Sequence, residues 1–460
     1  MRFVKKLKKR ILEYPDFLII VISVFFGLIV SKGKIAADDL SIYKDVGSGI
    51  SSWIKWTIDQ YYTWSSRQLI NFVWIAILRC GRWAWFLYMS ISMFVMLKSL
   101  KLLFGSNDKR IELFGITMMM LFPFTAITNA GWVATTVSYF GPQAFAIMSL
   151  VPIKNALKGE KTNIFQFVIY CCCLLYGANA EQTCIVLLGL YGIATIYFIF
   201  YLHKCDWHIL ILTILAIISL VYTITCPGNW ARDGAEVAHW FPTYQMLDLF
   251  NKVDIGLSTT LHWLFAEGRV FMIMICAMMA YFVWNKYTES LYRVVSFIPI
   301  CAVLAMGPFS NILINLFPYM DQSMADVNRY GEFVADISQL GKGIIQFEMF
   351  LLICICLCVE IFLLNDTIED IIIDMSLAIM GVASRVMMGF SPTVYASSER
   401  TYTSLIFCFI LMAVHIYSKN YKCLNVRNNS KILNIERYIL WTLVILGFMN
   451  LMYLVAVVLY

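Results

Sequence analysis

The stretch FLIIVISVFFGLIVSKGKIAADDLS, residues 17–41, joins an apolar run to two adjacent carboxylates. Residues 17–30 carry no charge, and they follow a basic cluster of Arg2, Lys5, Lys6, Lys8, Lys9 and Arg10. Because basic residues beside a membrane span stay in the cytoplasm, the cluster is expected inside and Asp38 and Asp39 outside. No A-x-A-like cleavage site follows the run, which is therefore predicted to be a retained signal anchor.

The composition is that of a polytopic membrane protein. The chain is 60% hydrophobic and 14% charged, and its mean hydropathy is +0.74. Apolar runs of about 17–25 residues recur along it, which is the length that crosses a bilayer as a helix. Only helices satisfy the backbone of such runs in lipid, so an all-α fold is expected. The net charge of +6 comes with basic residues clustered in short loops, which favours membrane orientation over nucleic-acid binding.

Hydropathy and loop charge predict one transmembrane domain over residues 1–460, with about 13 transmembrane helices. The N-terminus is expected inside and the C-terminus outside. The outer loops are expected at 45–81, 226–266 and 318–343, and Pro123 and Gly307 are expected to break spans. The predicted spans are 17–30, 83–103, 113–127, 135–153, 164–177, 184–202, 209–225, 271–284, 294–317, 344–364, 371–390, 401–417 and 438–458.

The first outer loop is expected to hold two interfacial helices. Its aromatic residues approximate a helical stripe, which is typical of a segment lying in the plane of the membrane interface. The stripe comprises Ile50, Trp53, Trp56, Tyr61 and Trp64, opposed by Lys55 and Asp59. Residues 70–78 are apolar but too short to span alone, so they form the second expected interfacial helix.

Five polar clusters are predicted at the outer face. Charged groups at span ends that are not basic anchors are costly to bury and are usually functional. Helices that return to one face can bring such clusters around one cavity. The clusters are Asp38-Asp39, Trp64-Ser-Ser-Arg67, Glu181-Gln182, Pro227-Gly-Asn-Trp-Ala-Arg232, and Ser391-Pro-Thr with Glu399-Arg400.

The acidic pair suits general-base chemistry. A carboxylate beside an acceptor hydroxyl can take its proton as the hydroxyl attacks an anomeric carbon. Two adjacent carboxylates in a partly dry site resist ionising together, so the pKa of Asp38 or Asp39 is predicted to rise. The alternative is a solvated span end or a helix N-cap, and the sequence leaves both interpretations open.

Four arginines are predicted in outer loops, although basic residues are usually enriched in cytoplasmic loops. As a set they suit phosphate, because guanidinium binds it bidentately and stays charged. For any one of them, solvation at the rim or contact with a lipid headgroup is an equal alternative. These arginines are Arg67, Arg232, Arg329 and Arg400. Arg385 lies inside a predicted span and is expected to face a polar interior or a carboxylate partner.

Other polar residues carry weaker signals. Pro227-Gly-Asn and Ser391-Pro-Thr are also explained by turn chemistry alone. His239 and His262 are more typical of structural histidines than of acid–base groups. The 14 cysteines lie mostly inside apolar runs, and no Cys or His cluster has the spacing of metal ligands.

The clusters and the layout together resemble the GT-C superfamily of polytopic glycosyltransferases. Those enzymes have an acidic motif in the first outer loop, interfacial helices after it, and a lipid-phosphate sugar as donor. The chain also resembles a bacterial family of multispanning proteins of unassigned function. It is similar in plan to serotype-converting glucosyltransferases, which decorate surface polysaccharides from a polyprenyl-phosphate sugar.

The resemblance implies roles for particular residues. Asp38 or Asp39 corresponds to the acidic first-loop position and becomes the catalytic base. Arg232 and Arg400 become candidates for binding the donor phosphate, and the substrate-binding set is completed by Arg67, Glu181, Asn229 and Glu399. Many enzymes of this layout need no metal with a lipid-monophosphate donor, whereas others with lipid-diphosphate donors use a divalent cation. The soluble C-terminal domain that several relatives use for the acceptor has no counterpart here.

The sequence therefore predicts a glycosyltransferase of the cell membrane whose active face is extracytoplasmic. Its partners are a polyprenyl-phosphate-linked sugar donor, a glycan, teichoic acid or lipid acceptor, and membrane lipids. One alternative is a flippase or transporter of lipid-linked sugars, which needs the arginines but no outer carboxylate. Another is a polymerase or ligase of surface glycans that uses a lipid-diphosphate donor.

Overall fold

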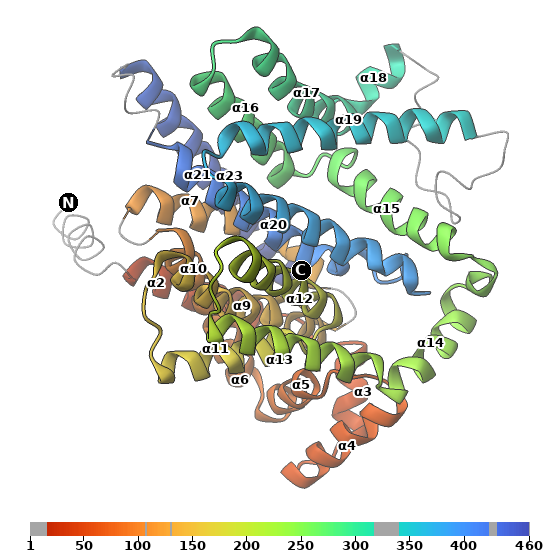
Figure 1. Ribbon diagram of the computed structural model, residues 1–460. Helices are drawn as coiled ribbons and strands as arrows, with labels where there is room; N and C mark the ends of the chain where they lie inside the picture. Colours follow the sequence, from red (N-terminus) through yellow and green to blue (C-terminus); the bar gives the residue numbers. More distant parts are fainter. Residues whose placement is uncertain (1–15, 106–107, 129–130, 317–339, 423–429, 460) are drawn as a thin grey trace. The chain divides into compact units, whose positions relative to one another are not determined.

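The computed structural model describes residues 16–105, 108–128, 131–316, 340–422 and 430–459, and over these ranges it is helical without a strand (Figure 1). This confirms the all-α prediction for the described ranges. Within these described ranges, eight helices are long and apolar enough to cross a membrane, or up to ten if each of two bent pairs is one span. They are Arg82–Gly105, Trp132–Lys158, Glu181–Tyr201, Trp207–Ile224, Phe347–Leu364, Ile368–Phe390, Ser398–Asn420 and Trp441–Val458. The predicted count of about 13 is not confirmed.

The lower count arises because several predicted spans form short helices. Helices α2 (Phe17–Val30) and α11 (Ile164–Gly177) have 14 residues each. Such a helix is about 21 Å long, against about 30 Å for the hydrocarbon core of a bilayer. Helix α7 (Lys109–Met120) ends before Pro123, and a 3-10 turn η2 (Phe124–Ile127) follows. The carbonyls released there are satisfied by Asn450, whose Nδ2 donates to Met120 O at 2.9 Å and to Phe122 O at 2.6 Å.

The chain divides into two compact units, Met1–Arg232 with Gly447–Tyr460, and Asp233–Leu446. In the first unit α2 packs on α6, α6 and α11 pack on α9, and α12 packs on α13. A Cβ on Gly27 would lie 2.8 Å from Phe86 O, so only glycine allows α2 to approach α6 this closely. The other α-helices of the first unit are α3 (Asp38–Asp45), α4 (Ile50–Thr63), α5 (Gln68–Cys80), α6 (Arg82–Leu100), α8 (Trp132–Thr135), α9 (Gly141–Ser149), α10 (Val151–Lys158), α12 (Glu181–Ile196) and α13 (Trp207–Ile224). Helix α14 (Pro227–Trp240) begins in the first unit and ends in the second. The π-helical segments η1 (Lys101–Gly105) and η4 (Tyr197–Tyr201) continue α6 and α12, and η3 (Thr136–Phe140) joins α8 to α9 within one candidate span.

Both segments expected as interfacial helices are helical, as α4 and α5. The orientation of α4 differs from the expected stripe. Its exposed apolar face is Ile50, Ile54, Ile58 and Tyr62. Trp53 instead contacts Phe72 of α5, with ring centroids 6.1 Å apart. The aliphatic residues at every fourth position, and not the tryptophans alone, therefore form the surface that α4 leaves free in this unit.

The second unit is built around α21 (Thr403–Asn420), in which residues 403–417 are all buried. Helix α20 (Ile368–Val386) packs on α21 and α15 (Leu249–Phe265) packs on α20. A helix that is apolar on every side needs such cover. The unit also holds α16 (Val270–Lys286), bent by 72° from α15, α17 (Ser290–Met306) and α18 (Ser310–Leu316), which meet at 86°, α19 (Leu340–Leu364), the 3-10 helices η5 (Tyr244–Met246), η7 (Met387–Phe390) and η8 (Ser398–Tyr402), and part of α23 (Ser430–Leu459).

The predicted outer loop 226–266 is largely helical. It contains α14 and α15, in which most residues from Asp254 to Phe265 are buried. Polar residues lowered the hydropathy of α15, although Asp254, Ser258 and Thr260 are all buried. Ser258 Oγ donates to Asp254 Oδ1 at 2.7 Å, and Thr260 Oγ1 donates to a backbone carbonyl one turn earlier. Most of the predicted loop 318–343, with Arg329, lies outside the described residues.

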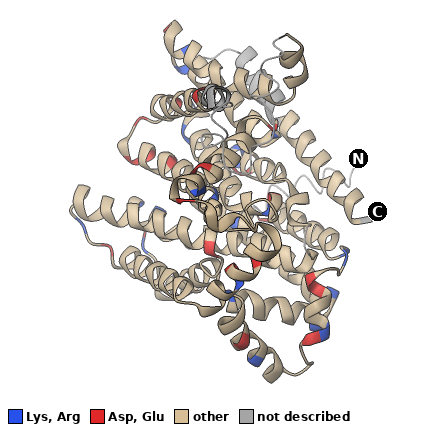
Figure 2. Cartoon of the chain, turned by 90° about the vertical axis from the view of Figure 1, so that its right-hand side faces the viewer, with Lys and Arg blue, Asp and Glu red and all other residues tan. Residues whose placement is uncertain are grey.

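Charged residues are sparse along the long helices. Figure 2 shows long stretches of helix without Lys, Arg, Asp or Glu, and many of the charged residues lie towards helix ends and connecting segments. This distribution is typical of helices whose middles face lipid or other apolar helices.

Candidate functional site

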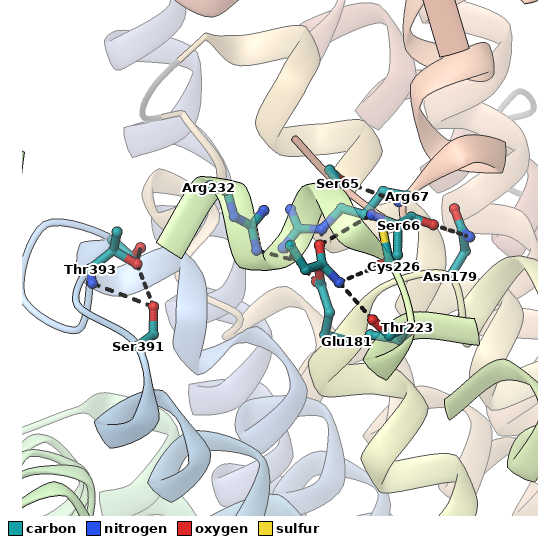
Figure 3. Close-up of polar contacts among 12 residues, drawn as sticks. Ser65, Ser66, Arg67, Asn179, Glu181, Thr223, Cys226, Arg232, Ser391 and Thr393 are labelled. Carbon is teal, nitrogen blue, oxygen red and sulfur yellow. Dashed lines mark hydrogen bonds and ion pairs between the residues drawn. The ribbon is translucent and has the colours of Figure 1, made fainter. Parts of the chain in front are cut away.

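Two of the five predicted polar clusters, together with Asn179 just before a third, meet at Ser66, between α4 and α5. Ser66 is fully buried, and its backbone amide donates to Asn229 Oδ1 at 3.2 Å. Asn229 Nδ2 donates in turn to Ser66 Oγ at 3.1 Å. On the other side, Asn179 Nδ2 donates to Ser66 O at 3.2 Å (Figure 3). The first turn of α14 and the connection before α12 are thereby joined to one loop residue.

The start of α14 docks closely on this loop. A Cβ on Gly228 would lie 2.4 Å from Trp64 N and 2.8 Å from Gln60 O, which are backbone atoms that cannot move independently. The Cys226 thiol donates to Tyr61 O at 3.1 Å. Turn chemistry alone does not explain Pro227-Gly-Asn, because the glycine permits the approach and the asparagine binds across it.

An ionic cluster lies directly beside this junction. Arg67 Nε donates a hydrogen bond to Glu181 Oε2 at 2.7 Å, and Arg67 Nη2 lies 2.6 Å from the same oxygen. Arg232 Nη2 lies 3.7 Å from Glu181 Oε1, so both guanidinium groups face one carboxylate (Figure 3). The side chains are 23%, 27% and 16% exposed for Arg67, Arg232 and Glu181, so the cluster is partly open. Two cations and one anion leave an excess of one positive charge.

The electrostatics of the cluster favour the charged forms. Burial works against the charge of Arg67, but the Glu181 carboxylate outweighs it and raises the pKa of this guanidinium above its usual range. Glu181 Oε1 accepts no hydrogen bond from any residue in the described part of the chain. The cluster therefore combines excess positive charge with one buried carboxylate oxygen that accepts no hydrogen bond from the described residues.

Asp39 is fully buried and its carboxylate receives three N–H groups. Trp74 Nε1 and Ala134 N donate to Oδ1 at 2.8 and 2.9 Å, and Val133 N donates to Oδ2 at 3.1 Å. These two amides belong to the first turn of the span that begins at Trp132. Asp39 thus caps a helix from another part of the chain.

Burial raises the pKa of Asp39, and the hydrogen bonds from Trp74, Ala134 and Val133 oppose this rise. The direction agrees with the prediction for the acidic pair. The cause differs from the repulsion between neighbouring carboxylates that the sequence analysis invoked. A side chain with this environment is better suited to positioning than to receiving a proton from a substrate.

Asp38 has the opposite environment. It begins α3 beside Asp39 and is exposed. The preceding residue, Ala37, has φ 49°, a conformation that a residue with a Cβ adopts only at a cost. The backbone turn therefore directs two neighbouring carboxylates into different surroundings.

Helix α5 connects the acidic pair with the ionic cluster. Its residue Trp74 contacts Asp39, and Arg67 directly precedes its first turn. Seven residues of helix separate them by about 10 Å along the axis. Both features belong to the first unit, so their relation depends on one short, regular element.

The remaining predicted site residues lie in the second unit. Glu399 Oε1 lies 2.7 Å from Arg269 Nη2, and Arg400 follows in the same 3-10 turn. The Ser391 and Thr393 hydroxyls lie 2.9 Å apart, so this pair stabilises its own turn. His262 Nδ1 lies 3.9 Å from Glu267 Oε1, whereas His239 is exposed on α14.

Sequence reasoning overlooked three contributors to the first-unit site. Ser66 was noticed only as a member of a polar cluster, Asn179 lies two residues before the predicted cluster Glu181-Gln182, and Trp74 was part of an apolar segment. Asn179 also holds the start of α5, because its Oδ1 accepts from Ile70 N at 3.1 Å. A polar residue just before an acidic helix start was the available signal for Asn179. For Trp74 no local signal existed.

Among the residues that the structure describes, no three His, Cys, Asp or Glu side chains are grouped so as to hold a metal ion. A comparison of the chain with models of known protein families, with curated proteins and with solved structures found no match. The functional argument therefore depends on the geometry of the site.

Proposed function

We propose that the chain is a membrane glycosyltransferase. It transfers a sugar from a polyprenyl-phosphate donor to a glycan, teichoic acid or lipid at the outer face of the cell membrane. The observation that carries the proposal is the placement of Arg67 and Arg232 around Glu181. Guanidinium groups with excess positive charge suit a phosphate that gains negative charge as its bond to the sugar breaks.

The proposed reaction uses Asp38 as the general base. Asp38 takes the proton of the acceptor hydroxyl, whose oxygen forms a bond to the anomeric carbon of the sugar. The bond between that carbon and the donor phosphate breaks, and polyprenyl phosphate leaves with the electron pair. Arg67 and Arg232 offset the charge of the leaving phosphate, while Glu181 Oε1 accepts from a sugar hydroxyl.

Asp39 acts in this proposal as a positioning residue. Its three hydrogen bonds hold α3 against α5 and against the start of the span at Trp132. The contact of Asp39 with Trp74 lies about two helical turns along α5 from Arg67. Glu399 and Arg400 remain candidates for contacts with the acceptor or the donor.

Transfer is tested with the full-length protein in nanodiscs, using labelled polyprenyl-phosphate sugar and purified envelope glycan or lipid as acceptor. Asp38→Asn is expected to lower the transfer rate by about 100-fold or more without weakening donor binding, because it removes only the base. Arg232→Gln is expected to weaken donor binding by about tenfold or more. Asp45→Asn, an exposed carboxylate on the same helix as Asp38, is the matched control for the base.

Wild-type transfer by Asp38→Asn would exclude it as the base. Wild-type donor binding by Arg232→Gln would remove the phosphate site. If the wild-type protein neither transfers the sugar nor binds the donor, the proposed function fails as a whole.

One observation favours a second candidate, a transporter of lipid-linked sugars. Such a protein needs ionisable groups within its spans, and the second unit buries Glu360, Asp370, Asp374 and His415 there. The same nanodiscs separate the two functions. Movement of the labelled lipid between leaflets without transfer to any acceptor supports the transporter and contradicts the transferase.

A further inference from the structure

The second unit contains a buried arginine, Arg385, in the last turn of α20. It is 2% exposed, and its guanidinium carbon lies 4.4 Å from the centre of the Tyr402 ring. Its Nε and Nη1 are buried and make no hydrogen bond within the described ranges. The sequence led us to expect a polar interior or a carboxylate partner for this residue, and the structure places the Tyr402 ring over its guanidinium group.

Arg385 ends a series of stacked contacts. The Tyr402 and Trp263 rings stack with centroids 4.1 Å apart and an interplanar angle of 18°. Arg269 lies 4.6 Å from the Trp263 ring. The Tyr402 hydroxyl donates to Thr259 O at 3.1 Å, which fixes the aromatic pair to α15. The surface that Arg385 contacts is therefore rigid.

The two arginines of this series differ in their charge balance. Arg269 contacts the carboxylates of Glu267 and Glu399. Arg385 has no carboxylate partner among the residues that the structure describes. Both guanidinium groups stay charged, because arginine does not deprotonate in proteins. The cation–π attraction to a ring face is much weaker than the free-energy cost of burying an unpaired charge. Arg269 has carboxylates that offset this cost, and Arg385 has none among the described residues.

Nitrogen atoms without partners gather around the same stack. Arg269 Nε, Trp263 Nε1 and His262 Nε2 are buried and form no hydrogen bond with any described residue. Arginine and indole nitrogens only donate, so the buried nitrogens of Arg269, Trp263 and Arg385 are an excess of donors without acceptors. A tetrahedral group with several acceptor oxygens matches that excess better than water or a neutral ligand.

We propose that Arg385 is the base of an anion-binding site in the second unit and that it binds a phosphate group. The group belongs either to a soluble phosphate or diphosphate or to a lipid headgroup, because the guanidinium recognises the same chemistry in both. This site uses none of the residues assigned to the donor phosphate. It stands whether or not the chain transfers a sugar.

The site is tested by phosphate binding to the full-length protein carrying Arg232→Gln, which weakens the proposed donor site. One arm titrates inorganic phosphate and diphosphate in detergent, and the other uses nanodiscs with and without polyprenyl phosphate. Saturable binding is expected in at least one arm, and Arg385→Gln is expected to weaken it by about tenfold or more. Arg293→Gln removes an arginine that also lies over an aromatic ring, Trp284, and is expected to bind like its parent.

The melting temperature without ligand gives a second readout that a structural arginine would not produce. Removing an uncompensated buried charge is expected to leave the melting temperature of Arg385→Gln unchanged or raised, and to abolish its rise with phosphate. Binding in the detergent arm identifies a soluble phosphate, whereas binding only with polyprenyl phosphate identifies a lipid headgroup. A lowered melting temperature, unchanged affinity in Arg385→Gln, or no saturable binding in either arm would overturn the proposal.

Discussion

Two neighbouring aspartates, Asp38 and Asp39, have different surroundings in the fold. Asp39 is buried and receives N–H groups from a tryptophan and a helix start, whereas Asp38 is exposed. A pair of carboxylates in the sequence carries no information about which of them the fold encloses. The assignment of base and positioning residue therefore depends on contacts with residues 35 and about 95 positions away along the chain.

The raised pKa of Asp39 predicts how stability changes with pH. The folded protein binds this proton more tightly than the unfolded chain, so the associated stability is fully present below the unfolded value of about 3.9. It falls as the pH rises through the higher pKa of the folded state. The expected loss is about 1.4 kcal/mol for each unit by which the folded pKa exceeds the unfolded value.

Thermal unfolding in detergent at pH 4 and pH 7 measures this effect as the difference between wild type and Asp39→Asn. Wild type is expected to lose stability relative to Asp39→Asn as the pH rises. Asp45→Asn, which changes an exposed carboxylate of the same helix, is the control. A wild type that gains stability relative to Asp39→Asn over this range contradicts the direction of the shift.

At the scale of elements, the approach of α14 to the loop before α5 assembles the site. Gly228 allows the contact, and Asn229 then binds Ser66 and, through Nδ2, Thr223 O at 2.9 Å. Arg232 follows one turn later on the same helix. The position of the second arginine beside Glu181 is therefore set by backbone packing at the first turn of α14.

Gly228→Ala is expected to destabilise the protein by about 1–3 kcal/mol, because the new methyl group meets backbone atoms that cannot turn aside. Gly234→Ala on the same helix is the matched control, since nothing lies within 4 Å of its Cβ position. Replacing an unhindered helical glycine is expected to stabilise by about 0.5–1 kcal/mol. The two melting temperatures should therefore shift in opposite directions, and equal shifts would argue against the close approach.

At the scale of the whole molecule, polar contacts between helices stabilise each unit in addition to apolar packing. In the second unit His415 of α21 lies between two carboxylates of α20. Its Nδ1 is 2.8 Å from Asp374 Oδ1 and its Nε2 is 3.3 Å from Asp370 Oδ1. Lys419 and Asn365 contact the same carboxylates at 2.6 and 2.7 Å. This network fixes how α20 and α21 pair.

His415→Gln is expected to cost about 3–5 kcal/mol of stability, because it leaves two buried carboxylates without their central partner. The exposed His239→Gln should stay within about 0.5 kcal/mol of wild type. Denaturant or thermal unfolding in micelles measures both. The double variant His415→Gln with Asp374→Asn should lose less than the sum of the single losses, since they share one contact. Full additivity would show that the network does not act as a unit.

The sequence alone was sufficient to predict an all-helical membrane protein, the helices α2 and α11 with the bounds that the structure gives them, and helices within residues 45–81. These features depend on local hydropathy and on neighbours three or four residues apart, which a sequence displays directly. The predicted number of spans is not confirmed, because hydropathy is ambiguous in segments such as α15. The buried polar side chains of α15 form hydrogen bonds within the same helix. Hydropathy is equally ambiguous at the end of α7, where Asn450 satisfies carbonyls that a continuous helix would bond.

The sites required the tertiary structure. Clustering of Arg67, Glu181 and Arg232 was foreseen only as a shared face, whereas the contact of Arg67 with Glu181 joins residues 114 positions apart. The burial of Asp39, the aromatic partner of Arg385 and the pairing of His415 also had no local signature. Their energies come from desolvation and from distant partners, and both exist only once helices far apart in the chain have packed.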